Sequence, residues 1–287
     1  MWEIILDTVT DSVRLLPFLL LTYLAMEYLE HKAGERMQVT VRHSGKWGPF
    51  LGSILGVFPQ CGFSAAAANL FAGRVISLGT LLAIYLSTSD EMLPILISEH
   101  VGADRILKIL GIKIIVGMAA GFVTDLTIHR PGHDHMDFKI HEEIHQLCDR
   151  HNCHCEEGIL RSALKHTLEI FAYILIITFI LNIVISLIGE NFLAEFILNR
   201  PVIGEMITGL IGLIPNCAAS VVITQLYLGG VLTAGAMLSG LLAGTGVGLL
   251  VLLRVNRRPA ENIKIIIMLY VIGVAAGILI DAAGVII

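Results

Sequence analysis

The sequence predicts an all-α polytopic membrane protein built from two inverted-topology repeats. Of its 287 residues, 55% are hydrophobic and only 15% are charged, and the mean hydropathy is +0.80. Soluble domains carry about 25% charged residues, whereas several apolar runs here approach the roughly 20 residues that cross a bilayer as a helix. An internal repeat and the placement of basic residues in the loops predict how these helices are organised.

The internal repeat has a constant spacing of 156 residues. The motif "GVFPQC" ends at Cys61 and matches "GLIPNC", which ends at Cys217, while "VGMAAGFVTD" matches "IGVAAGILID" further along each copy. Internal repeats in a membrane protein are typical of transporters. The predicted organisation is a first transmembrane repeat over 1–128, a linker over 129–160 and a second repeat over 161–287.

Loop charges predict the orientation of the two copies, because short cytoplasmic loops carry an excess of Lys and Arg. In each copy one connecting loop is basic, and its counterpart in the other copy is not. The basic residues are Lys32, Arg36, Arg42 and Lys46 in the first copy and Arg254, Arg257, Arg258 and Lys264 in the second. Equivalent loops therefore fall on opposite sides, which predicts inverted repeats, an outside N-terminus and a cytoplasmic linker.

The first apolar run, from Ile4 to Glu27, is predicted to be a retained transmembrane helix. No Lys or Arg precedes it, and it contains Asp7, Asp11 and Arg14. A cleaved signal peptide has a basic start and a short uninterrupted apolar stretch.

The next apolar segment, 48–72, is predicted to be a re-entrant hairpin because Pro59 is disfavoured inside a helix. Each arm has about 11 residues, or roughly 16 Å, which is about half of the hydrocarbon thickness. The two predicted turns, near the bilayer midplane, are Pro59-Gln60-Cys61 and Pro215-Asn216-Cys217. The alternative is that the two prolines only kink ordinary spanning helices.

Two spanning helices complete each repeat. Segment 75–97 is predicted to be a spanning helix that carries Asp90 and Glu91 in its outer half, with the alternative that Pro94 ends this helix early. The helix that follows contains Gly117 and Gly121, a GxxxG pair typical of close helix packing. Each repeat then has three transmembrane helices and one hairpin.

The interrupted segments predict a central binding site. Helix breaks free backbone carbonyls, which favour cations, and expose helix N-termini, which favour anions. A carboxylate within an apolar helix costs at least about 2.5 kcal/mol and marks ion or proton paths, so Asp90 is the first candidate ligand. The predicted substrate- or metal-binding residues are Asp90, Glu91, Gln60, Asn216, Cys61, Cys217, Ser64, Ser220, Thr88 and Thr245. The alternative is that the tip residues cap the broken arms and that both acids lie near the outer surface.

Three polar residues in the first helices of the two repeats are candidates for a proton or ion relay, namely Asp11 in the first repeat and His166 and Glu169 in the second. Asp11 could instead pair with Arg14 along the same helix.

The linker contains "HRPGHDHMDFKIHEEIHQLCDRHNCHC", which is rich in imidazole and thiol groups. Such groups bind zinc, copper or nickel. The candidate metal-capture residues are His133, His135, His141, His145, Cys148, Cys153, His154 and Cys155. The alternative is a solvated loop that binds nothing.

These motifs resemble a family of bacterial inner-membrane proteins described as ten-helix heavy-metal exporters, also called arsenic-efflux-like permeases or manganese transporters. The resemblance rests on "GVFPQC", "GLIPNC", "STSDE" and the His-rich linker, and it extends over nearly the whole chain. It implies export of a toxic metal or metalloid and leaves manganese, zinc and arsenite open.

We therefore expect a secondary transporter that exports a divalent transition metal by alternating access, coupled to protons. Oxygen ligands favour manganese, whereas the two thiols favour zinc or cadmium. The alternatives are a permease for arsenite, an organoarsenical or another neutral or anionic solute, and an intramembrane thiol enzyme, which lacks a His base near either Cys in sequence. We expect no enzymatic activity, no cofactor beyond the transported ion and metal held by the linker, contact with membrane lipid and no nucleic-acid partner. A homo-oligomer is compatible with the sequence.

Overall fold

The structure is a computed structural model in which the regular elements are α-helices. It describes residues 47–58, 61–89, 92–128 and 202–284, together with scattered helical positions between 13 and 24 and between 164 and 180. The scattered positions fall in the first predicted helix of each repeat. The linker, 129–160, lies outside the described residues.

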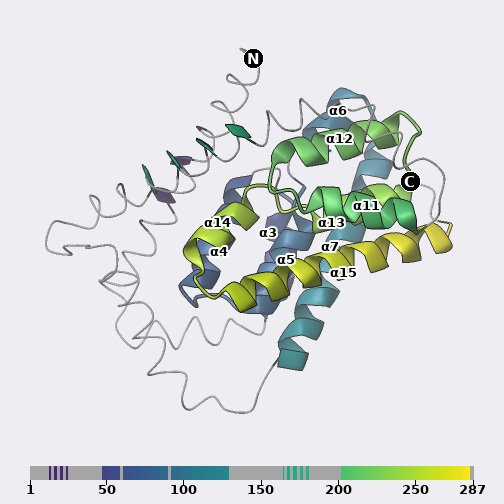
Figure 1. The fold of residues 1–287 in the computed structure, drawn as a ribbon. Helices are drawn as coiled ribbons and strands as arrows, with labels where there is room; N and C mark the ends of the chain where they lie inside the picture. The colour runs from purple at the N-terminus through teal and green to yellow at the C-terminus, as the bar shows by residue number, and fades with distance from the viewer. Residues whose placement is uncertain are drawn as a thin grey trace, which may run out of the picture.

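The described helices follow the same order in both halves of the chain (Figure 1). In the first half they are α3 (Gly48–Gly56), α4 (Cys61–Ala72), α5 (Leu78–Ser87), α6 (Met92–Ser98) and α7 (Ala103–Ile128). In the second half they are α11 (Ile203–Gly212), α12 (Cys217–Leu228), α13 (Ala234–Ala243), α14 (Gly248–Val255) and α15 (Pro259–Ala282). Within the described residues, four stretches are long and apolar enough to cross a membrane, namely Leu78–Ser98, Ala103–Thr127, Ala234–Val255 and Pro259–Ala282.

Helix packing repeats between the two halves. Helix α5 packs against α3 and α7 as α13 packs against α11 and α15. Two further pairs cross between the halves, because α4 packs on α14 and α12 packs on α6 (Figure 1). Each half therefore completes the packing of the other.

The GxxxG glycines lie where helix backbones touch. A Cβ atom added to Gly117 would lie 2.8 Å from the carbonyl oxygen of Ala83, and one added to Gly273 would lie 2.9 Å from that of Ser239. Real Cβ atoms essentially never approach another heavy atom so closely. The close packing predicted for Gly117 is confirmed, and Gly273 packs in the same way in the second half.

Asp125, near the end of α7, binds the start of α5. Its carboxylate accepts hydrogen bonds from the Ser77 hydroxyl at 2.7 Å and the Gly79 backbone N–H at 2.9 Å. The Ser77 oxygen in turn accepts from the Thr80 N–H at 3.0 Å, which is the usual N-cap contact. Asp125 therefore stabilises a helix start that would otherwise leave donors without partners.

Asp281 makes the same contacts at the start of α13. It accepts from the Thr233 hydroxyl at 2.5 Å and the Gly235 N–H at 2.6 Å, and Thr233 accepts from the Ala236 N–H at 3.1 Å. Sequence analysis matched these two acids across the copies without assigning them a contact. The structure gives both the same capping role.

We expect Asp125→Ala and Asp281→Ala each to destabilise the protein by about 2 kcal/mol, because each removes two hydrogen bonds to a charged acceptor. The midpoint of thermal unfolding in detergent should fall by a similar amount for both, since their contacts are equivalent. The matched controls are Asp125→Asn and Asp281→Asn, which keep one acceptor oxygen and should lose less. An unchanged midpoint for either Ala variant would contradict the capping role.

The first interrupted segment doubles back on itself as a helical hairpin. Gly48 lies against Thr80 near the start of α5, and Gly56 lies against Ser87 at its end. Helix α3 therefore runs alongside α5 in the same direction. Residues 73–77 then join the end of α4 back to the start of α5, so the chain enters and leaves at one end.

The second interrupted segment has the same shape. Gly204 lies near Ala236 at the start of α13, and Gly212 lies against Gly240 near its end. Residues 229–233 lead from α12 back to the start of α13. Both breaks fall at the predicted prolines, where the helix loses a backbone donor and meets the proline ring.

The starts of α5 and α13 lie near opposite ends of α15. The Arg74 guanidinium, just before α5, donates to both carboxylate oxygens of Glu261 at 3.2 and 2.9 Å. Glu261 is in the first turn of α15, whereas Asp281, which binds the start of α13, is in its last turn. At 1.5 Å per residue these two acids are about 30 Å apart along the helix axis.

The predicted spanning segment 75–97 keeps its spanning length, but it is interrupted, because α5 ends at Ser87 and α6 begins at Met92. The Ser87 hydroxyl donates to the Ala83 carbonyl, and the Thr88 hydroxyl donates to the Ile84 carbonyl, both at 2.8 Å. Such side-chain bonds to the preceding turn compete with the helical ladder and bend helices.

The equivalent segment of the second half is also broken, between α13 and α14 over residues 244–247. Gly246 has a φ of 52°, a left-handed conformation that glycine adopts without the steric cost of a Cβ atom. The part of each half that the structure describes therefore contains two interrupted segments, where one was predicted.

Candidate ion-binding site

A small cavity with several polar lining groups lies where three of these interruptions meet. Its lining comes from the residues after α5, from the tip and second arm of the second hairpin, and from the end of α13 with the break after it. The lining residues are Thr88, Ser89, Gly212, Asn216, Ala219, Ser220, Gly240, Leu241, Gly244 and Gly246. Its internal volume, about 10 Å³, is on the order of one water-sized site, which suits a single ion.

Asn216 stands at the tip of the second hairpin and is 4% exposed. Its side-chain oxygen accepts a hydrogen bond from the Ala218 N–H at 3.3 Å, so it caps α12. It also lines the cavity with Ser220, one turn further along α12. Asn216 therefore caps α12, as the alternative prediction stated, and it also lines the cavity.

Thr88 and Ser89 approach the cavity from the other half of the chain, and both are buried. The Ser89 hydroxyl donates to the Val57 carbonyl at 2.5 Å, which connects the α5–α6 break to the first hairpin. Thr245 is also buried, and it lies between the cavity-lining residues Gly244 and Gly246. The polar groups here are hydroxyl, amide and backbone oxygens.

The equivalent serines of the two hairpins have different surroundings. Ser220 lines the cavity, whereas Ser64 is fully buried against α14, where a Cβ atom on Gly248 would lie 2.7 Å from that of Ser64. Both serines were predicted to bind the substrate or metal. Of the two, Ser220 lines the cavity and Ser64 lies against α14.

The two predicted cysteines begin the second arms of the hairpins, because Cys61 is the first residue of α4 and Cys217 is the first residue of α12. The following predicted residues lie outside the described residues altogether: Gln60, Asp90, Glu91, Asp11, His166, Glu169 and the eight His and Cys residues of the linker. Among the residues that the structure describes, no three His, Cys, Asp or Glu side chains gather as a metal site.

Two buried donors near the cavity were missed by sequence analysis. Lys113 in α7 donates to the Leu241 carbonyl at 2.5 Å, and Tyr85 in α5 donates through its hydroxyl to the Gly248 carbonyl at 3.0 Å. Both side chains are fully buried. The signal for Lys113 was a single basic residue within the apolar run "ILGIKIIVG", since such residues in membrane helices usually mark functional sites.

Apolar helices of spanning length, interrupted around a small cavity that hydroxyl and amide groups line, define a multi-pass membrane protein with the architecture of a transporter. Residues 1–196 match a family model described as "Putative, 10TM heavy-metal exporter". Because the match covers more than half of the sequence, the chain belongs to this family, whose description indicates export of heavy metals. No curated protein and no solved structure matches the chain.

Proposed function

We propose that the protein is a secondary transporter that exports a divalent transition metal from the bacterial cytoplasm across the inner membrane, in exchange for protons. The observation that carries this proposal is the ion-sized cavity between interrupted helices of both halves, in a member of a heavy-metal exporter family. Transporters commonly place their ion sites at such breaks near the bilayer midplane.

The ligand chemistry favours manganese among the divalent metals. The lining contributes hydroxyl oxygens from Thr88, Ser89 and Ser220 and the amide of Asn216. Asp90 and Glu91 directly follow Ser89 in the chain and would supply the negative charge that neutralises a divalent ion. Oxygen ligands suit manganese, whereas thiolate from Cys61 or Cys217 would shift the preference toward zinc or cadmium.

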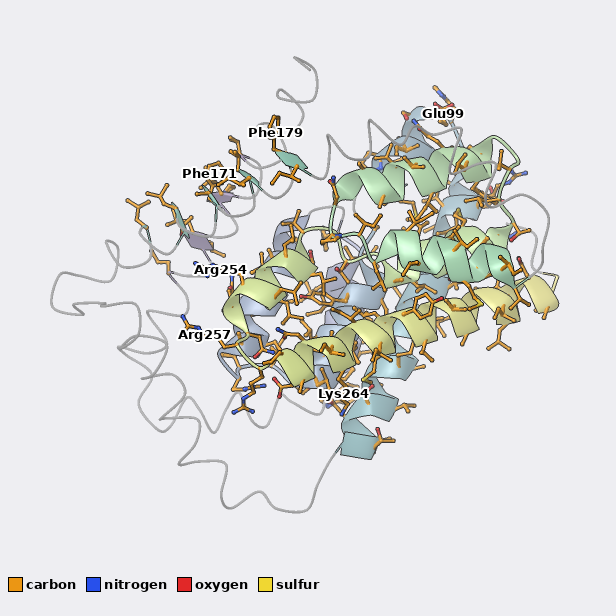
Figure 2. All side chains as sticks on the ribbon, viewed as in Figure 1. Glu99, Phe171, Phe179, Arg254, Arg257 and Lys264 are labelled. Carbon is orange, nitrogen blue, oxygen red and sulfur yellow. The ribbon has the colours of Figure 1, made fainter. Side chains whose placement is uncertain are left out.

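Alternating access follows from the inverted relation that we assign to the two halves. Two observations support it: α5 and α13 start near opposite ends of α15, and equivalent connections lie at opposite ends of the molecule. Figure 2 places Glu99 at one end and Arg254, Arg257 and Lys264 at the other. By the positive-inside rule, the basic end faces the cytoplasm, and the N-terminus lies outside.

A permease for arsenite, an organoarsenical or another neutral or anionic solute is the second candidate. The observation that favours it is the N-terminus of α12, which reaches the cavity through Asn216 and Ser220. Helix N-termini attract negative charge through their backbone N–H groups. The two candidates differ in the sign of the substrate charge, which can be tested directly.

We assign the His- and Cys-rich linker a supply role at the cytoplasmic face. A segment outside the membrane can raise the local metal concentration through imidazole and thiolate ligands. It cannot line a cavity between interrupted membrane helices. On this proposal the linker acts upstream of the transport step.

A metal panel with purified protein in lipid vesicles tests the proposed function. We expect dye-loaded vesicles to report manganese flux that exceeds zinc and cadmium flux and that moves protons in the opposite direction. The reason is the oxygen-rich lining, which suits the harder ion. Flux of arsenite or an organoarsenical without flux of any divalent metal would contradict metal export and favour the second candidate.

Two equivalent serines provide the matched variants for this assay. Ser220→Ala should raise the manganese concentration for half-maximal flux, because it removes a hydroxyl from the cavity lining. Ser64→Ala removes the same atom at the α4–α14 contact and should leave that concentration unchanged. An equal effect of the two substitutions would mean that the cavity is not the transport site.

A further inference from the structure

Lys113 is a cation buried within a membrane-spanning helix. It lies ten residues into the 26-residue helix α7, about 15 Å from the start of that helix and therefore deep in the apolar layer. Its side chain is fully buried. Charged groups at such depth are costly, and they are retained where they serve ion or proton pathways.

The ammonium group of Lys113 lies at a freed backbone carbonyl. Leu241 belongs to the last turn of α13, where carbonyls lack partners within the helix. The carbonyl of Gly240 accepts from the Gly244 N–H at 2.9 Å, and the carbonyl of Leu241 accepts from the Lys113 ammonium at 2.5 Å. Leu241 and Gly244 also line the polar cavity.

The second half of the chain shows whether this helix packing requires a lysine. The residue equivalent to Lys113 is Leu269, which is equally buried. The carbonyl equivalent to that of Leu241 belongs to Tyr85, and it accepts from the Thr88 N–H at 3.3 Å. A leucine therefore suffices for the equivalent packing, so the helix arrangement alone does not explain a cation at residue 113.

Carbonyls at the C-terminal ends of broken half-helices are the groups that coordinate sodium ions or protons in transporters. The negative end of the helix dipole adds to the attraction of a cation. An ammonium group presents one positive charge and three donors to such a site. A lysine placed there substitutes for a bound monovalent metal ion.

We propose that the end of α13 at Leu241 is a monovalent-cation site whose resident occupant is the Lys113 ammonium. Transport is then independent of sodium, because the positive charge that closes the α13–α14 break is supplied by the chain itself. This inference rests on the proposed function in one respect, namely that the cavity next to Leu241 is the transport site. It adds a second ion position beside that of the exported metal.

The test is the salt dependence of stability in Lys113→Met, which keeps an unbranched side chain and removes the charge. The purified variant is heated in choline chloride, potassium chloride or sodium chloride at equal ionic strength. We expect its unfolding midpoint to be about 5 °C higher in sodium than in choline, because a bound ion stabilises the folded state by mass action. The wild type and Lys113→Arg should show the same midpoint in all three salts.

Leu269→Met is the control for the substitution itself, because it places the same side chain at the equivalent position of the other half. It should show no sodium response. A second variant, Lys113→Ala, leaves room for a small cation, and methylammonium should raise its midpoint relative to choline. If the unfolding midpoint of Lys113→Met and that of Lys113→Ala are each the same in every salt, the cation site is overturned and Lys113 is only a cap of α13.

The readout is stability, so it separates this inference from the proposed function. A sodium response in Lys113→Met with no metal flux in the wild type would retain the cation site and reject metal export. Metal flux in the wild type without a sodium response in Lys113→Met would retain metal export and reject the cation site.

Discussion

Asp90→Asn is expected to lower manganese flux at least about tenfold, a loss of about 1.4 kcal/mol or more in transition-state stabilisation, while folded protein accumulates normally in the membrane. Asp90 follows Thr88 and Ser89, which line the cavity. Its repeat equivalent is Gly246, so the second half offers no carboxylate at this position to replace it. A divalent ion held only by neutral oxygens lacks charge compensation in a medium of low dielectric constant.

Two control substitutions test whether the loss of flux is specific to Asp90 or follows from the loss of any acidic side chain. Glu91→Gln should have a smaller effect, because Asp90 is the first candidate ligand. Glu99→Gln changes an acid at the far end of the molecule (Figure 2) and should leave flux unchanged. Vesicle flux and the amount of protein after membrane extraction are measured together. Near-normal flux in Asp90→Asn would remove this residue from the binding site.

Asn216→Asp is expected to distinguish a cationic from an anionic substrate. Aspartate caps a helix as well as asparagine does, so the contact with the Ala218 N–H should persist. The added negative charge at the cavity should lower the half-saturating manganese concentration by about tenfold, or 1.4 kcal/mol. For an anionic solute the same substitution should abolish transport, because like charges repel in the buried cavity.

Two further substitutions at residue 216 separate the cap from the ligand. Asn216→Ser keeps a capping oxygen but shortens its reach into the cavity, so it should fold normally and bind manganese more weakly. Asn216→Leu removes the polar group entirely and should lose both stability and flux. If Asn216→Asp and Asn216→Leu impair manganese flux equally, Asn216 does not bind the ion and serves only as a cap.

The sequence by itself was sufficient for the membrane class, the repeat and the two hairpin breaks. These features depend on local properties: apolar runs of spanning length, motifs at a constant spacing, and a proline that the helix interior does not accommodate at residues 59 and 215. The same local properties did not predict the break within segment 75–97. Its hydropathy resembles a continuous helix, and the bonds from Ser87 and Thr88 to the preceding turn cannot be inferred from hydropathy.

Only the tertiary structure decided which groups meet at the cavity. Ser64 and Ser220 are equivalent in sequence, yet Ser64 packs on α14 and Ser220 lines the cavity. Lys113 reaches a carbonyl 128 residues away. A sequence pattern gives the period of a helix and the place where it ends, whereas a freed carbonyl acquires its partner only when helices from the two halves pack together.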